Sequence, residues 1–512
     1  MNIRLITYIL GQIMRAEGAM MLLPLVFSLV YREDTVMALL IPAVTLLLLG
    51  GLLTWRRPAR RDRMSAKDGM IAVGFSWIVL SVFGMLPFML GGYLTNPIDA
   101  FFETVSGFTT TGATVTGEVL GVFPEDLDRG IALWRSLTHW IGGMGVLVFV
   151  LAVMPQEEFK SARLMHAMRA EVPGPVATKV VATIRRSALI MYAIYVLLTL
   201  IQLVLLLFGN MSLYDALLHA VSTAGTGGFS NMNASIGAFD SSYIHWVITV
   251  FMLLFSLNFN VYYLILTRQV LRAIGSEELR WFLGIVLGAV AVITLNIASL
   301  YDSTWIALRD AAFQVASFIS TTGFVTANYD VWPSLSQGIL LLLMFVGGCA
   351  GSTAGGLKIH RCIILIKGAM SEMRSLVFPR QVRTVRAEGR TVEEDVVRNA
   401  NGYYVLYLVL FTVSVLLVLV SGEGLITSFT AVTSCLNNVG PGMGEVLGVT
   451  GGGSFGGFSP WIKLLLSFNM LLGRLEIFPI LILFYPAVWK GRKKSKKIDK
   501  NHKNTIDNHV TA

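Results

Sequence analysis

The composition of this 512-residue chain excludes a water-soluble globular protein. Hydrophobic residues make up 54% of the chain and charged residues only 14%, with a mean hydropathy of +0.68. Soluble domains carry about 25% charged residues. A helix that spans a bilayer needs about 20 predominantly apolar residues, and the sequence contains about ten such segments. We therefore expect an all-α polytopic membrane protein embedded in a lipid bilayer.

The formal net charge of +9 indicates membrane topology and not a nucleic-acid partner. Basic residues concentrate in the stretches 56–67, 160–186, 358–398 and 490–503, and the loops at the other ends of the apolar segments lack such clusters. This asymmetry follows the positive-inside rule, which places basic loops in the cytoplasm. We expect both chain termini to be cytoplasmic. The three cysteines give neither a disulfide framework nor the spacing of a metal site.

The apolar segments repeat one order along the chain. Residues 3–31 and 36–55 predict two opening spans. Four units follow, and each consists of a span outward, a short helix with a loop, and a span inward. The paired spans are expected at 70–94 and 131–155, 186–209 and 242–268, 280–301 and 335–366, and 401–421 and 460–489. The corresponding divisions are 1–66 for the opening spans, 67–156, 157–270, 271–368 and 369–489 for the units, and 490–512 for a basic cytoplasmic tail.

One glycine in each unit has the same sequence context. A serine lies six residues before each glycine, and a short apolar segment with helical character precedes each serine. The four serine and glycine pairs are Ser106 and Gly112, Ser222 and Gly228, Ser317 and Gly323, and Ser434 and Gly440. Asn96 before Pro97 predicts the start of the first short helix, and Ser212 predicts the start of the second. We expect four pseudo-repeats around a central pore.

Glycine loops at membrane depth suit a path for cations. A dehydrated cation needs oxygen ligands, and rings of backbone carbonyls supply them without placing fixed charge in the membrane. Glycine adopts the backbone conformations that aim carbonyls inward, which other residues rarely do. A short helix that ends at such a loop also directs the negative end of its dipole toward the cation. Close helix packing at small residues is the alternative explanation for any one loop.

Five motifs give the chain a specific resemblance to a known family. They are 109–114 (TTTGAT), 134–145 (WRSLTHWIGGMG), 347–358 (GGCAGSTAGGLK), 435–442 (CLNNVGPG) and 473–476 (GRLE). With these motifs, essentially the whole chain resembles the Trk/Ktr/HKT superfamily of potassium transporters, and most closely the TrkH-type membrane subunits of the bacterial Trk system. The resemblance implies potassium uptake across the bacterial cytoplasmic (inner) membrane, without enzymatic chemistry and with no organic cofactor on this chain. It also implies a homodimer and a cytosolic, TrkA-like regulatory subunit that binds nucleotide.

The resemblance further implies that the four loops form a K⁺ selectivity filter with one glycine each. Members with glycine at the first of these positions prefer potassium and members with serine prefer sodium, so Gly112 predicts potassium selectivity. The expected filter residues are Thr110, Thr111, Gly112, Thr226, Gly227, Gly228, Thr321, Thr322, Gly323, Asn438, Val439 and Gly440.

A dense run of glycines interrupts the third inward span. The resemblance implies that this run is an intramembrane gating loop below the filter, with Arg474 beneath the filter as a barrier to cations. The expected gate residues are Gly347, Gly348, Gly351, Gly355, Gly356 and Arg474. A phosphate-binding loop is the alternative, but the Gly-Lys-Ser/Thr ending and the strand–loop–helix context are missing. For Arg474 the alternative is a structural ion pair with Glu476, although residues two apart on a helix point to different faces.

Several other polar residues have two interpretations. Arg135 and His139 share one helix face, where His139 is expected to be a packed residue and not a ligand. Four asparagines lie in spans, where they either hydrogen-bond between helices or line a cavity: Asn258, Asn260, Asn296 and Asn469. Five acidic residues either concentrate cations at a pore mouth or are ordinary solvated charges: Asp99, Glu103, Glu118, Asp126 and Asp128. Two other functions remain open, namely a Na⁺- or H⁺-coupled potassium symporter and a membrane scaffold that transports nothing.

Overall fold

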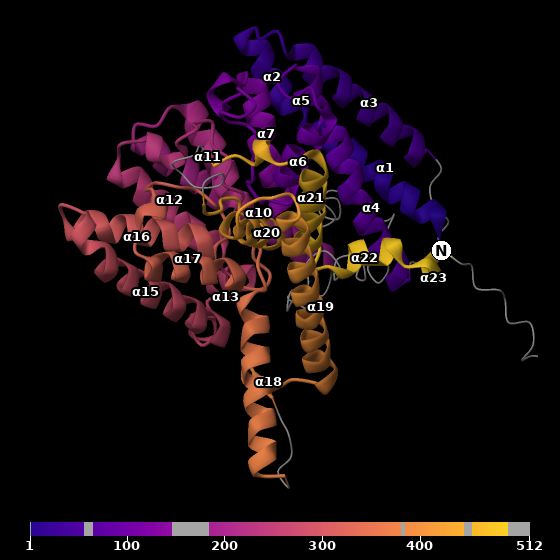
Figure 1. The fold of residues 1–512 in the computed structure, drawn as a ribbon. Coiled ribbons are helices and arrows are strands. Elements are labelled where there is room, and N and C mark those ends of the chain that lie inside the picture. The colour runs from indigo at the N-terminus through magenta and orange to yellow at the C-terminus, as the bar shows by residue number, and fades with distance from the viewer. Residues whose placement is uncertain (1, 56–64, 146–183, 380–384, 445–452, 490–512) are drawn as a thin grey trace, which may run out of the picture.

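The computed structural model describes residues 2–55, 65–145, 184–379, 385–444 and 453–489, and most of these residues are helical (Figure 1). Within these ranges the strands form one short antiparallel hairpin, β1 (Arg386–Ala387) with β2 (Arg390–Thr391). The prediction of a mainly α-helical chain is confirmed. The predicted tail 490–512 and most of the basic stretch 160–186 lie outside the described residues.

The helices are numbered along the chain. In the first half they are α1 (Ile3–Met20), α2 (Leu22–Tyr31), α3 (Val36–Thr54), α4 (Ala66–Gly84), α5 (Leu86–Leu90), α6 (Pro97–Phe108), α7 (Arg129–Gly143), α10 (Ile184–Phe208), α11 (Leu213–Gly225), α12 (Ser242–Phe255), α13 (Phe259–Leu266) and α14 (Val270–Ile274). In the second half they are α15 (Glu277–Ile297), α16 (Thr304–Ile319), α17 (Ser334–Val346), α18 (Ile359–Val377), α19 (Glu394–Leu419), α20 (Leu425–Asn437), α21 (Pro460–Arg474), α22 (Phe478–Phe484) and α23 (Pro486–Trp489).

Among the described residues, six helical segments are long and apolar enough to cross a membrane, or seven if one bent pair counts as a span. The six are Ile3–Tyr31, Val36–Thr54, Lys67–Leu90, Ala188–Phe208, Glu277–Leu300 and Glu394–Leu419. They coincide with the two predicted opening spans and the four predicted outward spans. Their outer faces expose large apolar side chains, such as Leu48 and Leu52 of α3 at 69% and 68%. Apolar exposure on this scale is typical of a surface that contacts lipid.

The predicted inward spans are not single helices. Where residues 242–268 were expected to be continuous, α12 and α13 meet at an angle of 91°. Residues 347–358 separate α17 from α18, and Glu476 and Ile477 have positive φ between α21 and α22. In the first unit α7 ends at Gly143, and the predicted remainder of that span, 146–155, lies outside the described residues. All the described inward segments therefore break or end at a comparable place.

The opening helices α1 and α3 pack closely together at one edge of the molecule (Figure 1). Small residues allow this approach, because a Cβ added to Gly50 would lie 2.6 Å from the Gly11 carbonyl oxygen. Membrane helices commonly use such small-residue contacts, since lipid provides no hydrophobic drive for their association. In contrast to these closely packed helices, α18 and part of α19 project away from the other helices (Figure 1).

Eight shorter helices form a closed cycle of contacts at the centre. Four of them precede the predicted glycine loops and are called loop helices below: α6, α11, α16 and α20. The other four are the first halves of the inward segments. Neighbours in the cycle are α6 and α7, α7 and α11, α11 and α12, α12 and α16, α16 and α17, α17 and α20, α20 and α21, and finally α21 and α6. The last contact joins helices more than 350 residues apart in sequence and closes the ring.

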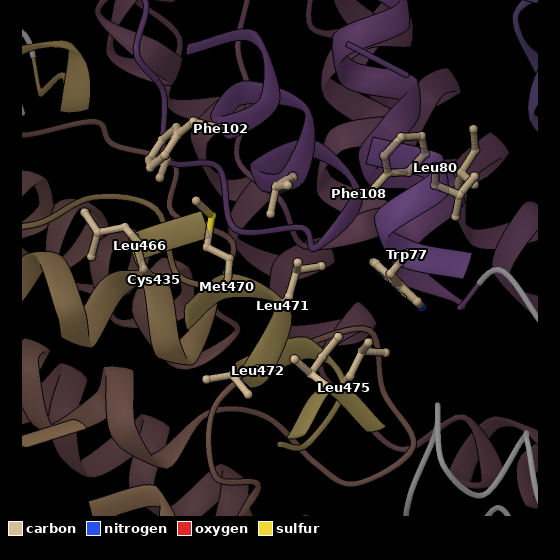
Figure 2. Packing of buried hydrophobic residues seen from close by; sticks show 14 of the residues in the cluster. Trp77, Leu80, Phe102, Phe108, Cys435, Leu466, Met470, Leu471, Leu472 and Leu475 are labelled. Carbon is tan, nitrogen blue, oxygen red and sulfur yellow. The ribbon is translucent and has the colours of Figure 1, made fainter. Parts of the chain in front are cut away.

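A buried apolar core fixes this closing contact. Figure 2 shows Phe102 of α6 on the side of Leu466 and Met470 of α21, whereas Phe108 lies beside Leu80 and Trp77 of α4. Phe102, Phe108 and Met470 are fully buried. In a membrane, close packing of such side chains stabilises a helix contact through van der Waals interactions. The buried core therefore fixes α6, the first loop helix, against α21 of the last unit.

The loop helices begin where the sequence predicts. The Asn96 side chain accepts a hydrogen bond from the Ile98 backbone at 2.9 Å, and Pro97 is the first residue of α6. Ser212 caps α11 in the same way, because its Oγ accepts a hydrogen bond from the Asp215 N–H at 3.1 Å. Two of the predicted interhelical asparagine contacts are also present, from Ser336 to Asn296 at 2.7 Å and from Ser414 to Asn469 at 3.1 Å.

Candidate functional site

The four glycine loops have the same backbone conformation. We call them loop 1 (109–116), loop 2 (226–231), loop 3 (320–325) and loop 4 (438–443). The glycines have positive φ angles of 78° at Gly112, 79° at Gly228, 82° at Gly323 and 106° at Gly440. Two residues earlier the backbone is left-handed, with φ of 55° at Thr110, 54° at Thr226, 55° at Thr321 and 55° at Asn438. Loops with only weak sequence similarity therefore share an unusual geometry.

The left-handed threonines are strained. A β-branched residue with positive φ is an outlier, and residues in sparsely populated regions cost of order 1–3 kcal/mol each. Such strain persists only where surrounding contacts determine the conformation, and it concentrates at functional sites. Thr110, Thr226 and Thr321 each belong to the expected filter. The shared outlier therefore points to these loops as the candidate site.

The loops contact one another in a closed cycle. A Cβ added to Gly112 would lie 1.9 Å from the Gly227 carbonyl oxygen in loop 2. A Cβ added to Gly228 would lie 2.0 Å from the Thr322 oxygen, one added to Gly323 2.1 Å from the Val439 oxygen, and one added to Gly440 2.7 Å from the Thr111 oxygen. Each glycine thus faces the carbonyl oxygen of the residue before the glycine in the next loop. Only glycine allows this approach, because any side chain would collide with the neighbouring carbonyl.

Each loop is also held by its own loop helix. The N–H before every glycine donates to the carbonyl of the predicted serine. The distances are 2.9 Å for Thr111 to Ser106, 3.0 Å for Gly227 to Ser222, 2.9 Å for Thr322 to Ser317 and 2.9 Å for Val439 to Ser434. The expected serine hydroxyl bonds to loop backbone occur in two loops, from Ser317 to the Phe324 oxygen at 2.6 Å and from Ser434 to the Gly440 oxygen at 2.7 Å. Ser106 Oγ has no such bond among the described residues.

Loop 2 differs from the others because His139 occupies the space behind it. Where loops 1, 3 and 4 have Thr111, Thr322 and Val439, loop 2 has Gly227. A Cβ at Gly227 would lie 2.2 Å from the His139 ring. His139 is fully buried, stacks on Phe229 with ring centroids 4.1 Å apart, and its Nδ1 lies 3.1 Å from Ser222 Oγ. It is a packed residue, as the sequence predicts.

The predicted gating residues form an intramembrane loop (347–358) between α17 and α18. Because helices flank it on both sides, the strand–loop–helix context of a phosphate-binding loop is absent from this place. Gly347, Gly351 and Gly356 have positive φ of 69°, 72° and 77°. The two ends of the loop touch, since a Cβ on Gly347 would lie 2.3 Å from the Gly355 oxygen. The glycines therefore make the narrow neck of the loop possible.

The intramembrane loop lies directly against glycine loops 3 and 4. The Gly355 N–H donates to Thr321 Oγ1 at 2.6 Å, and the Gly356 N–H donates to the Asn437 carbonyl at 3.0 Å. On another side, the Cys349 N–H donates to the Ser256 carbonyl at 3.0 Å, where the second inward segment breaks. The loop thus contacts the strained Thr321 from one side and the bend between α12 and α13 from the other.

Arg474 connects the intramembrane loop to the first unit. Its guanidinium donates to the Thr353 carbonyl at 2.7 Å and to the Gly142 and Gly143 carbonyls at 2.6 Å each. Glu476 forms an ion pair with Arg361 of α18.

Sequence reasoning missed Glu278 as part of this region. The Glu278 side chain is buried, and its Oε1 accepts a hydrogen bond from the Ala350 N–H of the intramembrane loop at 2.6 Å. Its Oε2 accepts from the Asn258 side chain at 3.4 Å. In the sequence Glu278 is one of two adjacent glutamates at a helix start, where N-terminal charge compensation explains both. No local signal separates it from its half-buried neighbour Glu277.

The acidic residues divide into two groups that the sequence did not distinguish. Glu118 and Asp126 are exposed, as expected for loop charges. Asp99 and Glu103 are not solvated and do not line an open mouth: they are buried and pair with Lys463 and Arg135 at 2.6 Å and 2.7 Å. Both expectations for these two residues are wrong, because basic residues distant in sequence neutralise them inside the fold.

Comparisons with known proteins agree with this geometry. The family profile TrkH, described as a cation transport protein, matches residues 36–491. The chain is 35% identical over 495 residues to the Trk system potassium uptake protein TrkH of Salmonella typhimurium, covering 96% of this chain and 100% of the relative. It is 29% identical over 477 residues to the Trk system potassium uptake protein TrkI of Halomonas elongata, covering 92% and 94%.

A solved structure is similar over the same extent. The crystal structure of the potassium transporter TrkH from Vibrio parahaemolyticus superimposes with a TM-score of 0.84 and 32% sequence identity, covering 96% of this chain and 100% of the other. Together with the apolar helices, these relatives identify an integral membrane protein, and the predicted resemblance is confirmed. The chain belongs to the TrkH family of cation transport proteins.

Proposed function

We propose that this chain is the potassium-translocating subunit of a Trk-type uptake system in the bacterial cytoplasmic membrane. The observation that carries the proposal is the closed cycle of four glycine loops, in which every glycine faces a backbone carbonyl of another loop. Carbonyl oxygens arranged around one axis replace the water of a dehydrated cation. The relatives named as Trk system potassium uptake proteins support K⁺ as the transported ion.

The filter in this proposal consists of three residues from each loop. Shared backbone geometry supports equal roles for them, and the strained residue at the inner end of each triplet supports a functional constraint. The residues are Thr110, Thr111 and Gly112; Thr226, Gly227 and Gly228; Thr321, Thr322 and Gly323; and Asn438, Val439 and Gly440. Gly112 in the first triplet supports selection of potassium over sodium.

The wider architecture is four pseudo-repeats with two additional opening spans, about ten spans in all. The central cycle of eight helices supports it, because each unit contributes one loop helix and one inward helix. The divisions at residues 66, 156, 270, 368 and 489 follow from this repeat. Both termini lie in the cytoplasm, and potassium enters from the side of the loop helices.

Uptake in this proposal needs no covalent chemistry on the chain. A monovalent cation that crosses about 100 mV gains about 2.3 kcal/mol. Because about 1.4 kcal/mol corresponds to a tenfold concentration ratio, this gain supports roughly fifty-fold accumulation. Membrane potential alone is therefore sufficient, and coupling to Na⁺ or H⁺ is the competing mechanism that flux measurements decide.

The intramembrane loop and Arg474 form the gate of the proposed pathway. Contacts of the loop with Thr321 and Asn437 support its place below the filter, and the Arg474 contact with Thr353 supports an electrostatic barrier there. Replacing Arg474 with Ala, or deleting residues 350–354, is expected to raise basal cation flux about tenfold or more. An unchanged flux in both variants would remove the gate assignment.

The regulated form in this proposal is a homodimer with a cytosolic, TrkA-like partner that binds nucleotide. The names of the relatives support membership of a multicomponent Trk system. The basic stretch 374–398 and the tail supply cytoplasmic charge for docking. Positive-inside topology accounts for the same charge without a partner, so removing the basic residues and measuring co-purification tests the docking.

Flux into liposomes tests the proposed function. Purified chain is reconstituted with and without its cytosolic partner, and uptake of K⁺, Rb⁺, Na⁺ and Li⁺ is compared under a set membrane potential. We expect flux that favours K⁺ and Rb⁺ and follows the potential alone. Flux that requires Na⁺ or a proton gradient would favour a symporter. Absence of flux even with the partner would favour a membrane scaffold.

A further inference from the structure

A buried charge pair connects the outer ends of glycine loops 1 and 2. Glu103 of α6 and Arg135 of α7 form an ion pair at 2.7 Å, with side-chain exposures of 0% and 5%. Ionised groups are costly to bury in a membrane protein unless they are paired and hydrogen-bonded, and they mark functional places. The partners of each residue therefore show what the pair holds.

Glu103 holds the segment of loop 1 that follows Gly112. Its carboxylate accepts a hydrogen bond from Thr114 Oγ1 at 2.9 Å and from the Val115 N–H at 2.9 Å, in addition to Arg135 Nε. The carboxylate is thus fully occupied by one cation, one hydroxyl and one backbone donor. These contacts fix the direction in which the chain leaves the first glycine.

Arg135 holds the corresponding segment of loop 2. Its Nη1 donates to the Ser230 carbonyl at 3.0 Å, and its guanidinium lies over the Phe229 ring, 3.6 Å from the centroid. Both residues directly follow Gly228. The planar guanidinium makes these contacts at the same time as the bond to Glu103, which a lysine ammonium does not reproduce. One side-chain pair therefore ties loop 1 to loop 2 behind their glycines.

Other loop junctions use neutral hydrogen bonds. Loops 3 and 4 are joined by Tyr329, whose hydroxyl donates to the Gly442 carbonyl at 2.8 Å. Loop 1 is joined to the last unit by the Phe455 N–H, which donates to the Thr114 carbonyl at 2.8 Å. The charge pair is therefore an additional constraint at one junction, and not a general requirement of the fold.

We propose that Glu103 and Arg135 are positioning residues for cation selection, which set the spacing between loops 1 and 2 without contacting the ion. This inference rests on the proposed filter. Selection between K⁺ and Na⁺ by carbonyls depends on the number and arrangement of the oxygens around the ion. Loosening one junction lets loops 1 and 2 adapt to the smaller ion. Discrimination then falls while conduction continues.

A second ion pair on the same helix provides a matched control. Asp99 lies one helical turn before Glu103 on α6 and pairs with Lys463 at 2.6 Å, with side-chain exposures of 7% and 5%. Among the described residues Asp99 bonds Lys463 and none of the glycine loops. Removing either carboxylate leaves a buried cation unpaired, so both changes carry a similar stability cost. Only the change at Glu103 disturbs a loop.

The test compares Glu103→Gln with Asp99→Asn in liposomes that contain the full chain. Measured quantities are the K⁺/Na⁺ flux ratio, the K⁺ flux and the thermal unfolding of the purified protein. We expect Glu103→Gln to lower the flux ratio about tenfold while K⁺ flux remains measurable, and Asp99→Asn to keep the wild-type ratio. Thr114→Val removes the hydroxyl that bonds Glu103 and, within loop 1, Thr116, and keeps the ion pair, so it should lower the ratio by a smaller factor without loss of folding.

The double variant Glu103→Gln with Arg135→Gln completes the test. If the two residues act as one unit, the flux ratio of the double variant should resemble that of the single variants and not the product of their effects. A wild-type ratio in Glu103→Gln and Thr114→Val, or an equal loss in Asp99→Asn, would overturn the inference while leaving the filter intact. A wild-type protein that does not discriminate between K⁺ and Na⁺ would instead refute the proposed function.

Discussion

The four glycine loops and the intramembrane loop that contacts loops 3 and 4 are both irregular backbone between helices, but they are held in different ways. Every glycine loop is closed by a backbone hydrogen bond to its own loop helix, at 2.9–3.0 Å in all four units. The intramembrane loop is held by Thr321 of its own unit, and also by residues of other units, namely Asn437 and Arg474 of the fourth and Ser256 of the second. The glycine loops are therefore closed locally, whereas the intramembrane loop also depends on contacts with other units, and we expect the two to respond differently to helix movement.

A loop closed on its own helix keeps its geometry when neighbouring helices shift. A loop held by several units is released when any of them moves, because its contacts are then lost together. The comparison predicts that changes in the glycine loops alter which cation crosses, whereas changes around the intramembrane loop alter how fast cations cross. The four predictions below test this separation and are ordered by expected size.

The largest effect is expected for Gly112→Ser. The new Cβ would lie 1.9 Å from the Gly227 oxygen, at a φ of +78° that disfavours any side chain. Loops 1 and 2 must separate, so the K⁺/Na⁺ flux ratio should fall tenfold or more, which corresponds to about 1.4 kcal/mol of discrimination per tenfold. Flux assays in liposomes with both ions measure the ratio.

Gly121→Ser is the control for this prediction. Gly121 also has positive φ, at +64°, but a Cβ there meets no atom within 4 Å. The backbone strain is therefore similar and the collision with a carbonyl is absent. Equal loss of discrimination in both variants would show that strain, and not the approach of the loops, governs selection.

A several-fold increase in basal flux is expected for Gly355→Ala. The added Cβ would lie 2.3 Å from the Asn437 carbonyl oxygen, which displaces the intramembrane loop from below loops 3 and 4. The flux ratio between K⁺ and Na⁺ should change less than the rate, because the closest atom to the added Cβ is the Asn437 oxygen, which precedes loop 4, and none of its three nearest atoms belongs to a filter glycine. Gly338→Ala in α17 is the control, since a Cβ there meets no atom within 4 Å. A change in ion selectivity without a change in rate would contradict the separation.

A smaller increase, about two- to threefold, is expected for Glu278→Gln. The neutral amide weakens the bond with the Ala350 N–H and places a donor against the Asn258 amide, so the closed loop loses part of its support. Glu277→Gln is the matched control, because Glu277 pairs with Lys367 outside the loop. Basal flux at a fixed potential distinguishes the two, and equal rates in both variants would exclude a role for Glu278 at the loop.

The smallest effect is expected for Ser336→Ala. This change removes the bond between Ser336 and Asn296, which joins α17 to α15 away from both loops. Interhelical hydrogen bonds in membranes contribute on average about 0.6 kcal/mol. A slight decrease in thermal stability, with wild-type flux and ion ratio, is the expected outcome. A shift in selectivity would show that the outward helices also control the glycine loops.

The sequence by itself determined the features that depend on local composition. Apolar length identified the opening and outward spans, since about 20 apolar residues suffice to cross the bilayer. Caps such as Asn96 and Ser212 marked helix starts, because their side chains bond backbone only a few residues away. The serine and glycine spacing located all four loops for the same reason, because the closing hydrogen bond is local to each unit.

The tertiary structure alone decided how distant segments meet. The left-handed conformation of Thr110, Thr226 and Thr321 contradicts the preference of threonine, although local hydrogen bonds at the helix ends hold it; the contacts between the four loops join segments far apart in the sequence. Glu103, Asp99 and Glu278 looked like ordinary surface or helix-end carboxylates. Their partners lie between 32 and 364 residues away, so no local pattern indicates that they are buried and paired. Close contacts between distant segments, and not local propensity, define the proposed ion path.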